Sequence, residues 1–302
     1  MYHLTPVGKI NSLLTDKFSV PRQGNLIADL ICELELLPPY NNPQALEQIA
    51  GFSHLWLIGI FSANVQSNNA QRLMVRPPRL GGNQRVGVFA SRSSFRPNNL
   101  SLSLVQLRQV KIEASGKVKL IIQGCDLIDQ TPIVDIKPYI PFADSPLPGQ
   151  EVKSGYVQAP ETFLAPLERQ GLFPQVPGVV WEFAPELLLP LGQSSLACLD
   201  YFSPEQLEAL EQEFASQFKL SVEQLAKVFY LSQILLKLIA LNPKPAYKQA
   251  CELEFGMSFA NFEVRWHERT QNEPAEHKQG LFAQDQGVRY IKLLSVEKKD
   301  ES

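Results

Sequence analysis

Arginine side chains are unevenly distributed along this chain. No Asp or Glu occurs between residues 48 and 112, although the full chain of 302 residues contains 31 acids. Guanidinium groups bind phosphates and carboxylates through paired hydrogen bonds, so this segment predicts a positive surface for an anionic ligand. The alternative is that its arginines pair with acids from elsewhere in the fold. The basic residues of the segment are Arg72, Arg76, Arg79, Arg85, Arg92, Arg96, Arg108 and Lys111.

The overall charge of −3 and the isoelectric point of about 5.9 argue by themselves against a nucleic-acid partner. A local positive surface is nevertheless enough for phosphate contacts, so the acid-free segment keeps RNA as a candidate. We expect no metal site, because the four cysteines are far apart and the four histidines do not cluster. Separated cysteines, no visible secretory signal and no apolar run of about 18 residues predict a cytoplasmic protein without a membrane segment.

The familiar cofactor and nucleophile motifs are missing. The sequence has no Gly-x-Gly-x-x-Gly, no Walker loop and no Gly-x-Ser-x-Gly. A Rossmann-type methyltransferase needs a glycine-rich loop after its first strand, so that fold is not expected.

The first half of the chain has the alternation that is typical of β-strands. Leu100, Leu102 and Leu104 alternate with serines, and patterning of this kind places one face of a strand on a core. With little helical pattern before residue 140, these strands predict a barrel or a sandwich. The expected strands are residues 32–36, 54–61, 85–90, 100–104 and 117–122.

The rest of the chain changes character twice. Ten prolines between residues 138 and 190 predict an irregular connection, with one strand at 179–183. Ser203-Pro204-Glu205-Gln206 then predicts a capped helix start, a second helix follows from 221 to 242, and 262–267 alternates as a strand. We therefore expect an α+β protein with a mainly β-barrel N-terminal domain (1–145), a Pro-rich irregular connection or insert (146–200) and a small C-terminal α+β domain (201–302).

Four local segments, taken in order and spacing, resemble the tRNA (N6-threonylcarbamoyladenosine) N6-methyltransferase family. The first contains Val20-Pro21-Arg22-Gln23, and the second contains Arg76-Pro77-Pro78-Arg79 and Ser94-Phe95-Arg96-Pro97-Asn98. The third is Asp126 to Tyr139, and the fourth begins with Asn242-Pro243-Lys244-Pro245 and ends near Trp266. The resemblance implies a β-barrel S-adenosylmethionine domain, a C-terminal domain that docks tRNA, and a homodimer. It also implies methylation of N6 of threonylcarbamoyladenosine at tRNA position 37.

The resemblance also implies site residues, carried over position by position. The cofactor contacts would be Arg22, Gln23, Gly24, Ser62, Ala63, Arg92, Leu102, Asp135, Ile136, Lys137, Pro138 and Tyr139. The RNA contacts would be Arg76, Arg79, Arg96, Lys244, Tyr247 and Lys248. This chain departs from the family at Ser62-Ala63 (often His-Gln), at Asn99 and Ser101 (often Pro and Gly), and at Asn242 (usually Asp).

The chemistry expected of such a site is displacement at a methyl group, which depends on positioning more than on acid–base catalysis. The acceptor is a ureido nitrogen, a poor nucleophile that a carboxylate such as Asp135 can polarise. Asp135 can equally pair with Lys137 or cap a turn. Arg92 and Arg96 can bind the threonyl carboxylate or the RNA backbone, or Arg96 can belong to a turn. The competing function is a non-catalytic nucleotide- or RNA-binding module.

Overall fold

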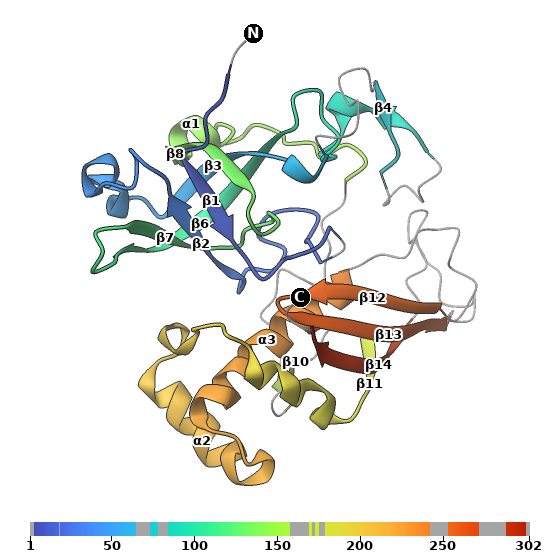
Figure 1. The fold of residues 1–302 in the computed structure, drawn as a ribbon. Helices are drawn as coiled ribbons and strands as arrows, with labels where there is room; N and C mark the ends of the chain where they lie inside the picture. Colours follow the sequence, from blue (N-terminus) through green and yellow to red (C-terminus); the bar gives the residue numbers. More distant parts are fainter. Residues whose placement is uncertain are drawn as a thin grey trace. The chain divides into compact units, whose positions relative to one another are not determined.

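The computed structural model describes residues 3–17, 19–64, 73–77, 84–157, 169–170, 173–174, 179–241, 253–271 and 288–299. The chain divides into two compact units, residues 1–164 and 165–302. Figure 1 shows the β-rich first unit in blue to green and the mixed second unit in yellow to red.

The first unit is built around a closed barrel of six strands in which every neighbouring pair is antiparallel. Its interior is filled by apolar side chains, including the fully buried Ile10, Leu34, Leu57 and Leu120. Around the barrel the order is β1 (Gly8–Asn11), β2 (Ile31–Leu36), β7 (Val118–Gln123), β6 (Leu100–Ile112), β3 (His54–Ile60) and β8 (Pro132–Pro138). Except at 85–90, the strands predicted for this half are present.

Strand β6 turns the opposite face to the core from the one that its pattern predicts. Ser101 and Ser103 are 4% and 2% exposed, whereas Leu102 is 53% exposed. Ser101 lies opposite Gly59 of β3, where a Cβ would come within 2.7 Å of the serine oxygen, so there is room here for small side chains only. Ser103 hydrogen-bonds a carboxylate, that of Asp126. Local packing therefore overrides the hydrophobic pattern and leaves leucines on the outside of the barrel.

The strand predicted at 85–90 is correct for only two residues. Strand β5 (Val86–Gly87) pairs with β4 (Met74–Val75), and residues Val88–Ala90 then form a short 3-10 turn, η6. Side chains hold this turn: Ser91 Oγ donates to the carbonyl of Val88 at 2.9 Å. The other short helices among the described residues of the first unit are η1 (Pro43–Leu46), η2 (Ile49–Gly51), η3 (Ser62–Asn64) and α1 (Pro141–Asp144).

In the part that the structure describes, the second unit combines a four-stranded sheet with two α-helices. The sheet order is β11 (Val179–Glu182), β14 (Val288–Lys298), β13 (Phe262–Gln271) and β12 (Leu253–Phe259), with β11 parallel to β14 and the other pairs antiparallel. The strand predicted near 179 is thus a member of the C-terminal sheet. Further elements are the pair β9 (Arg169–Gln170) and β10 (Phe173–Pro174), the 3-10 helices η8 (Pro185–Gln193) and η9 (Leu199–Tyr201), and the helices α2 (Pro204–Phe218) and α3 (Val222–Leu241).

Helix α3 is the core helix of the second unit. It is 20 residues long, and within the described part of the chain it alone is long and apolar enough to qualify as a membrane span. However, 78% of its most apolar window is buried inside the protein. A helix that is apolar on nearly all sides is typical of such a buried position, so its composition is explained by packing.

Candidate active site

The first half of β6 has an edge that β7 does not cover. The β6–β7 pairing begins at Gln106 opposite Gln123, so residues 100–105 of β6 extend beyond the end of β7. The loop around Gly24 lies there instead: a Cβ on Gly24 would lie 3.3 Å from the Leu104 carbonyl and 3.5 Å from the Gly124 carbonyl. The loop that carries Arg22, Gln23 and Gly24 is thus placed beside β6.

Two residues in left-handed conformation fasten this loop. Asn25 has φ 63° and Gly124 has φ 78°, and the Asn25 N–H donates to the Gly124 carbonyl at 2.9 Å. The Gly124 N–H in turn donates to the Leu30 carbonyl at 2.9 Å. A side chain at position 124 would collide with the Asn25 amide, so glycine is required on both conformational and steric grounds.

Asp126 connects the same loop to β6 and is influenced by the charge of Arg92. Ser103 Oγ donates to Asp126 Oδ1 at 2.5 Å. Burial raises the pKa of Asp126 above the ordinary value of a carboxyl, while the Ser103 hydrogen bond, the charge of Arg92 and the backbone of Gly24 oppose the rise. The sequence did not single out Asp126; only the buried Ser103 opposite it, seen after folding, identifies it.

A row of side chains crosses the outside of three neighbouring strands. Leu102 of β6 lies opposite Ile58 of β3, and Ile58 lies opposite Asp135 of β8. An irregularity in the β3–β8 pairing skips Val134, and such bulges re-aim the side chains beside them. Leu102 and Asp135, far apart in sequence, are thereby brought to the two sides of β3.

The end of β8 supplies the other carried-over positions. Asp135 is exposed, and its Oδ1 accepts from the Ile136 N–H at 2.9 Å, a local contact of the kind that caps a turn. Tyr139 packs its ring 6.1 Å from that of Trp56 and places its hydroxyl 2.5 Å from Ser145 Oγ. A cavity of about 330 Å³ lies at this end of β8 and is lined by Val7, Leu36, Tyr40, Ala45, Leu46, Glu47, Ile49, Phe52, Asp135, Ile136 and Pro138.

The loop that carries Arg92 is shaped by its own polar side chains. Arg96 Nη1 donates to the Ser91 carbonyl at 2.9 Å, so this guanidinium supports the turn. Tyr156 Oη donates to the Ala90 carbonyl at 2.9 Å. Arg92 itself is exposed. Asn99 has φ 51°, a left-handed conformation that proline cannot adopt. The backbone of this loop therefore requires a residue other than the proline that is frequent at this position in the family.

Other predicted site residues lie in different surroundings or outside the described part of the chain. Ser62 and Ala63 are exposed in η3, directly after β3. Arg76 is exposed just beyond β4. Arg79, Lys244, Tyr247 and Lys248 lie outside the described residues. Within the described residues, no group of three or more His, Cys, Asp or Glu side chains is placed to hold a metal ion.

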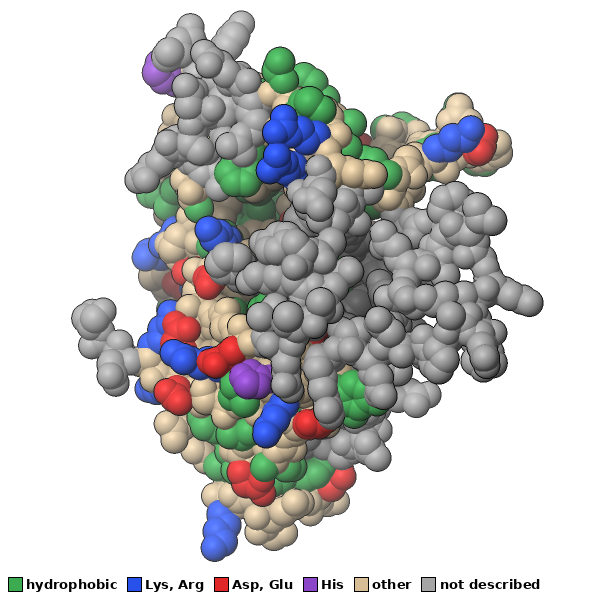
Figure 2. Space-filling model, turned by 90° about the vertical axis from the view of Figure 1, so that its right-hand side faces the viewer, with side chains coloured by type: hydrophobic (Ala, Val, Ile, Leu, Met, Phe, Trp, Pro, Cys, Tyr) green, Lys and Arg blue, Asp and Glu red, His purple; other side chains and the backbone are tan. Residues whose placement is uncertain are grey.

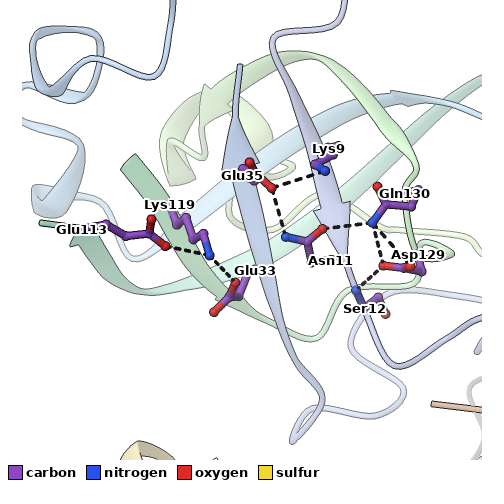
Figure 3. Close-up of polar contacts among 9 residues, drawn as sticks. All are labelled: Lys9, Asn11, Ser12, Glu33, Glu35, Glu113, Lys119, Asp129 and Gln130. Carbon is purple, nitrogen blue, oxygen red and sulfur yellow. Dashed lines mark hydrogen bonds and ion pairs between the residues drawn. The ribbon is translucent and has the colours of Figure 1, made fainter. Parts of the chain in front are cut away.

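The opposite side of the barrel wall carries paired charges, as Figure 3 shows. On β1 and β2, Lys9 lies 3.4 Å from Glu35. Lys119 of β7 contacts Glu113 at 2.8 Å and Glu33 at 3.2 Å. The Lys119 hydrogen bond lowers the pKa of Glu113, and the same bond raises the pKa of Lys119. The outside of β1, β2 and β7 is thus polar and internally paired, unlike the row of Leu102 and Ile58.

Comparison with known proteins decides between the candidate functions. Residues 9–145 match the tRNA-methyltransferase O N-terminal domain, and residues 207–274 match the TrmO C-terminal domain. The tRNA (adenine(37)-N6)-methyltransferase of Escherichia coli (strain K12) is 43% identical over 175 residues, which cover 56% of this chain and 72% of that protein. This chain belongs to the tRNA-methyltransferase O family.

The similarity to the TrmO family extends over both units. RcsF of Pseudomonas aeruginosa (strain PAO1), which carries the name of an S-adenosylmethionine-dependent methyltransferase, is 31% identical over 267 residues, 88% of this chain and 92% of that protein. The crystal structure of TrmO from P. aeruginosa aligns with 99% of this chain and 97% of that chain, with a TM-score of 0.51 and 25% identity.

The family resemblance and the fold class predicted from the sequence are therefore confirmed. TrmO proteins are S-adenosylmethionine-dependent methyltransferases of N6 of adenine 37 in tRNA, and their two-domain organisation is the one found here. Membership also favours an enzyme over the competing non-catalytic RNA-binding module.

Proposed function

We propose that this protein methylates N6 of threonylcarbamoyladenosine at position 37 of tRNA, at a site on the outside of β6, β3 and β8. The observation that carries the proposal is the convergence of the Gly24 loop, Leu102 and Asp135 on one part of the barrel, although they come from three separate regions of the sequence. The family membership supplies the reaction, and the convergence supports the location.

The residues that converge there fit S-adenosylmethionine. Its adenosine and methionine parts need apolar surface, which the half-exposed Leu102 provides. Its hydroxyl and ammonium donors need a carboxylate such as the exposed Asp135, and its carboxylate needs a cation such as the exposed Arg92. When bound, S-adenosylmethionine supplies an electrophilic methyl group; the protein holds the acceptor in line with it.

Asp135 is the carboxylate that we assign to the acceptor N–H. A ureido nitrogen carries little negative charge, and a hydrogen bond to an exposed carboxylate increases it in the transition state. The hydrogen bond from Ile136 fixes Oδ1 and thereby restricts the rotation of the side chain. We assign recognition of the threonyl carboxylate to Arg96.

The acid-free segment supplies the RNA contacts in this proposal. Arg76 and Arg85 directly follow and precede the paired residues Val75 and Val86, so two exposed cations lie at one end of the β4–β5 hairpin. Figure 2 shows a group of basic side chains next to hydrophobic ones near the top centre of the view. Arg79, Lys244, Tyr247 and Lys248, which lie outside the described residues, are proposed as further tRNA contacts.

The protein is proposed to act as a homodimer through the apolar outside of β6 and β3. Leu102 is 53% exposed there, and neighbouring Ile58 and Trp56 are only partly covered. The paired charges on β1, β2 and β7 make that other face unsuitable for burial against a second copy. A symmetric interface uses the same patch on both copies, which suits one strip on each barrel.

We place the protein in the cytoplasm, where tRNA is modified. The described cysteines Cys32, Cys125 and Cys198 are buried free thiols, as a reducing compartment allows. Burial raises the pKa of Cys198 to about 11, which keeps that thiol protonated and unreactive.

The proposed substrate is tested with two forms of one tRNA, a transcript that carries threonylcarbamoyladenosine at position 37 and the unmodified transcript. Nucleoside mass spectrometry after incubation with S-adenosylmethionine should detect methylation of the modified RNA only. Donors that are left without their anionic partner in the enclosed complex disfavour the unmodified substrate by orders of magnitude in rate. Equal methylation of both transcripts would rule out threonylcarbamoyl recognition, and methylation of neither would rule out the activity.

A further inference from the structure

Asp126 is a carboxylate of the barrel unit that the proposed chemistry does not use. It follows β7 and the Gly124–Asn25 clamp directly, and its side chain is only partly exposed. Burying a carboxylate is costly unless hydrogen bonds and opposite charge compensate it. Besides its own backbone, three groups compensate it, and they come from different parts of the chain: the Ser103 hydroxyl, the Gly24 backbone and the Arg92 guanidinium.

Two of these three groups belong to the cofactor site proposed above. A Cβ on Gly24 would lie 3.9 Å from the Asp126 carboxyl carbon, so the loop passes directly over the carboxylate. Arg92 is exposed, and its charge stabilises ionised Asp126. The third group, Ser103, lies on β6 one residue after Leu102 and faces the barrel interior. Asp126 therefore lies behind the cofactor site and contacts it from the inside.

We propose that Asp126 is a positioning residue, which holds the Gly24 loop beside β6 and attracts Arg92 through its charge, so that both are ordered before S-adenosylmethionine binds. The inference rests on the proposed location of the cofactor site. A carboxylate suits this role because it only accepts hydrogen bonds and carries the charge that an exposed arginine needs for a fixed direction. Groups ordered in advance lose less entropy on binding, so the gain is in cofactor affinity.

Asp129 provides a matched control three residues further along. Its Oδ1 accepts from the Ser12 N–H at 2.9 Å and from Gln130 Nε2 at 3.3 Å, within the polar group drawn in Figure 3. Both carboxylates thus fasten loops of the same barrel, but only Asp126 contacts the Gly24 loop. Asp129→Asn should leave the affinity for S-adenosylmethionine unchanged.

The experiment measures the dissociation constant of S-adenosylmethionine by calorimetry and the two KM values by steady-state kinetics, with the full-length protein. Asp126→Ala should weaken cofactor binding about tenfold or more, the scale found when a residue that orients a ligand-binding group is removed. Asp126→Asn should have a smaller effect, because it keeps an acceptor for Ser103 and the Gly24 backbone. KM for S-adenosylmethionine should rise while KM for tRNA stays constant, which a general loss of stability would not produce.

A double-mutant cycle tests the connection to Arg92. If Asp126 acts by holding Arg92, then Arg92→Ala should weaken binding less in the Asp126→Asn background than in the wild-type background. If Asp126→Ala does not fold, Ser103→Ala tests the same proposal, because it removes one hydrogen bond to Asp126 and keeps the carboxylate. This variant should again raise KM for S-adenosylmethionine and leave KM for tRNA unchanged.

The outcomes separate the two proposals. Weaker binding in Arg92→Ala, with unchanged binding in all Asp126 and Ser103 variants, would keep the cofactor site and overturn the positioning role. Unchanged binding in Arg22→Ala, Arg92→Ala and the Asp126 variants alike would overturn the site and the inference together. Additive effects in the cycle would overturn the action through Arg92.

Discussion

At the scale of single residues, environment separates two aspartates of similar sequence context. Asp126 and Asp129 both follow β7, but one faces a buried serine and the other a surface amide. Burial opposes the ionisation of Asp126. The ionised Asp126 therefore lowers the stability of the fold. Proteins keep a residue that lowers the stability of the fold where that residue serves a functional site.

The first prediction concerns the pH dependence of that cost. The pKa of Asp126 is raised on folding, so the unfolded chain releases this proton at lower pH than the folded chain. The contribution of Asp126 to the free energy of unfolding should therefore fall as pH rises from the unfolded to the folded pKa, and this contribution should stay constant above it. Asp126→Asn lacks this term, so its stability relative to wild type should increase across the same window. Urea unfolding at a series of pH values measures the difference; a pH-independent difference would contradict the prediction.

The second prediction concerns the clamp under the Gly24 loop. Gly124→Ala forces a side chain into φ 78° and into the Asn25 amide. The left-handed conformation alone costs about 1–2 kcal/mol, and the collision adds to it. Gly116→Ala is the matched control, because Gly116 has φ 81° and nothing within 4 Å of its Cβ position. Thermal unfolding should show the larger loss for Gly124→Ala, and only this variant should bind S-adenosylmethionine more weakly. Equal losses in both variants would remove the steric argument.

At the scale of elements, β6 joins two functions in one strand of 13 residues. Its second half pairs with β7 and closes the barrel, while its first half lies beside the Gly24 loop. In the second unit, α2 begins with a capping box in which Ser203 and Gln206 exchange side-chain and backbone hydrogen bonds. This box was predicted from the sequence and is confirmed.

The third prediction concerns that cap. Ser203→Ala leaves the Gln206 N–H without its 3.3 Å acceptor and should lower the free energy of unfolding by about 1 kcal/mol. Ser203→Asp, another good capping residue, should stay close to wild type. Chemical unfolding of the full chain measures both, and equal stability of the alanine variant and wild type would show that α2 is held by packing alone.

At the scale of the whole molecule, the barrel wall is divided into a polar part and an apolar part. The outside of β1, β2 and β7 carries ion pairs, whereas that of β6 and β3 carries Leu102 and Ile58. The proposed cofactor site and the proposed dimer interface lie on the apolar part. Assembly and catalysis would then depend on the same surface.

The fourth prediction tests this surface. Leu102→Glu should weaken the dimer at least about a hundredfold, since each copy loses the burial of one leucine, about 1.5–3 kcal/mol, and gains an unpaired charge. Ile112→Glu is the control, because Ile112 is 57% exposed at the far end of the same strand. Sedimentation analysis gives the dissociation constants. A dimer unaffected by Leu102→Glu would place the interface elsewhere.

The fifth prediction concerns tRNA. If Arg76 and Arg85 contact phosphates, replacing each by alanine should weaken binding and reduce the slope of log affinity against log salt by about one per contact. Lys153→Ala is a suitable control, since Lys153 is paired with Glu151 at 3.4 Å. Unchanged slopes in both arginine variants would exclude the hairpin from the RNA surface.

The sequence by itself determined four of the six barrel strands (β2, β3, β6 and β7), the capping box of α2 and the family, but it did not predict the barrel strands β1 and β8. These follow from local signals: alternation, capping residues and short ordered motifs, none of which depends on distant packing.

Only the tertiary structure decided which face of β6 is buried and which aspartate lies behind the Gly24 loop. Alternation in the sequence defines two faces of a strand, but the neighbouring residues in the fold decide which face is buried. Here Gly59 lies opposite Ser101 and Asp126 accepts a hydrogen bond from Ser103, so both serines face the inside of the barrel. The row from Leu102 to Asp135 likewise depends on register and on the bulge at Val134. Register between strands far apart in the chain arises from packing, which no local pattern encodes.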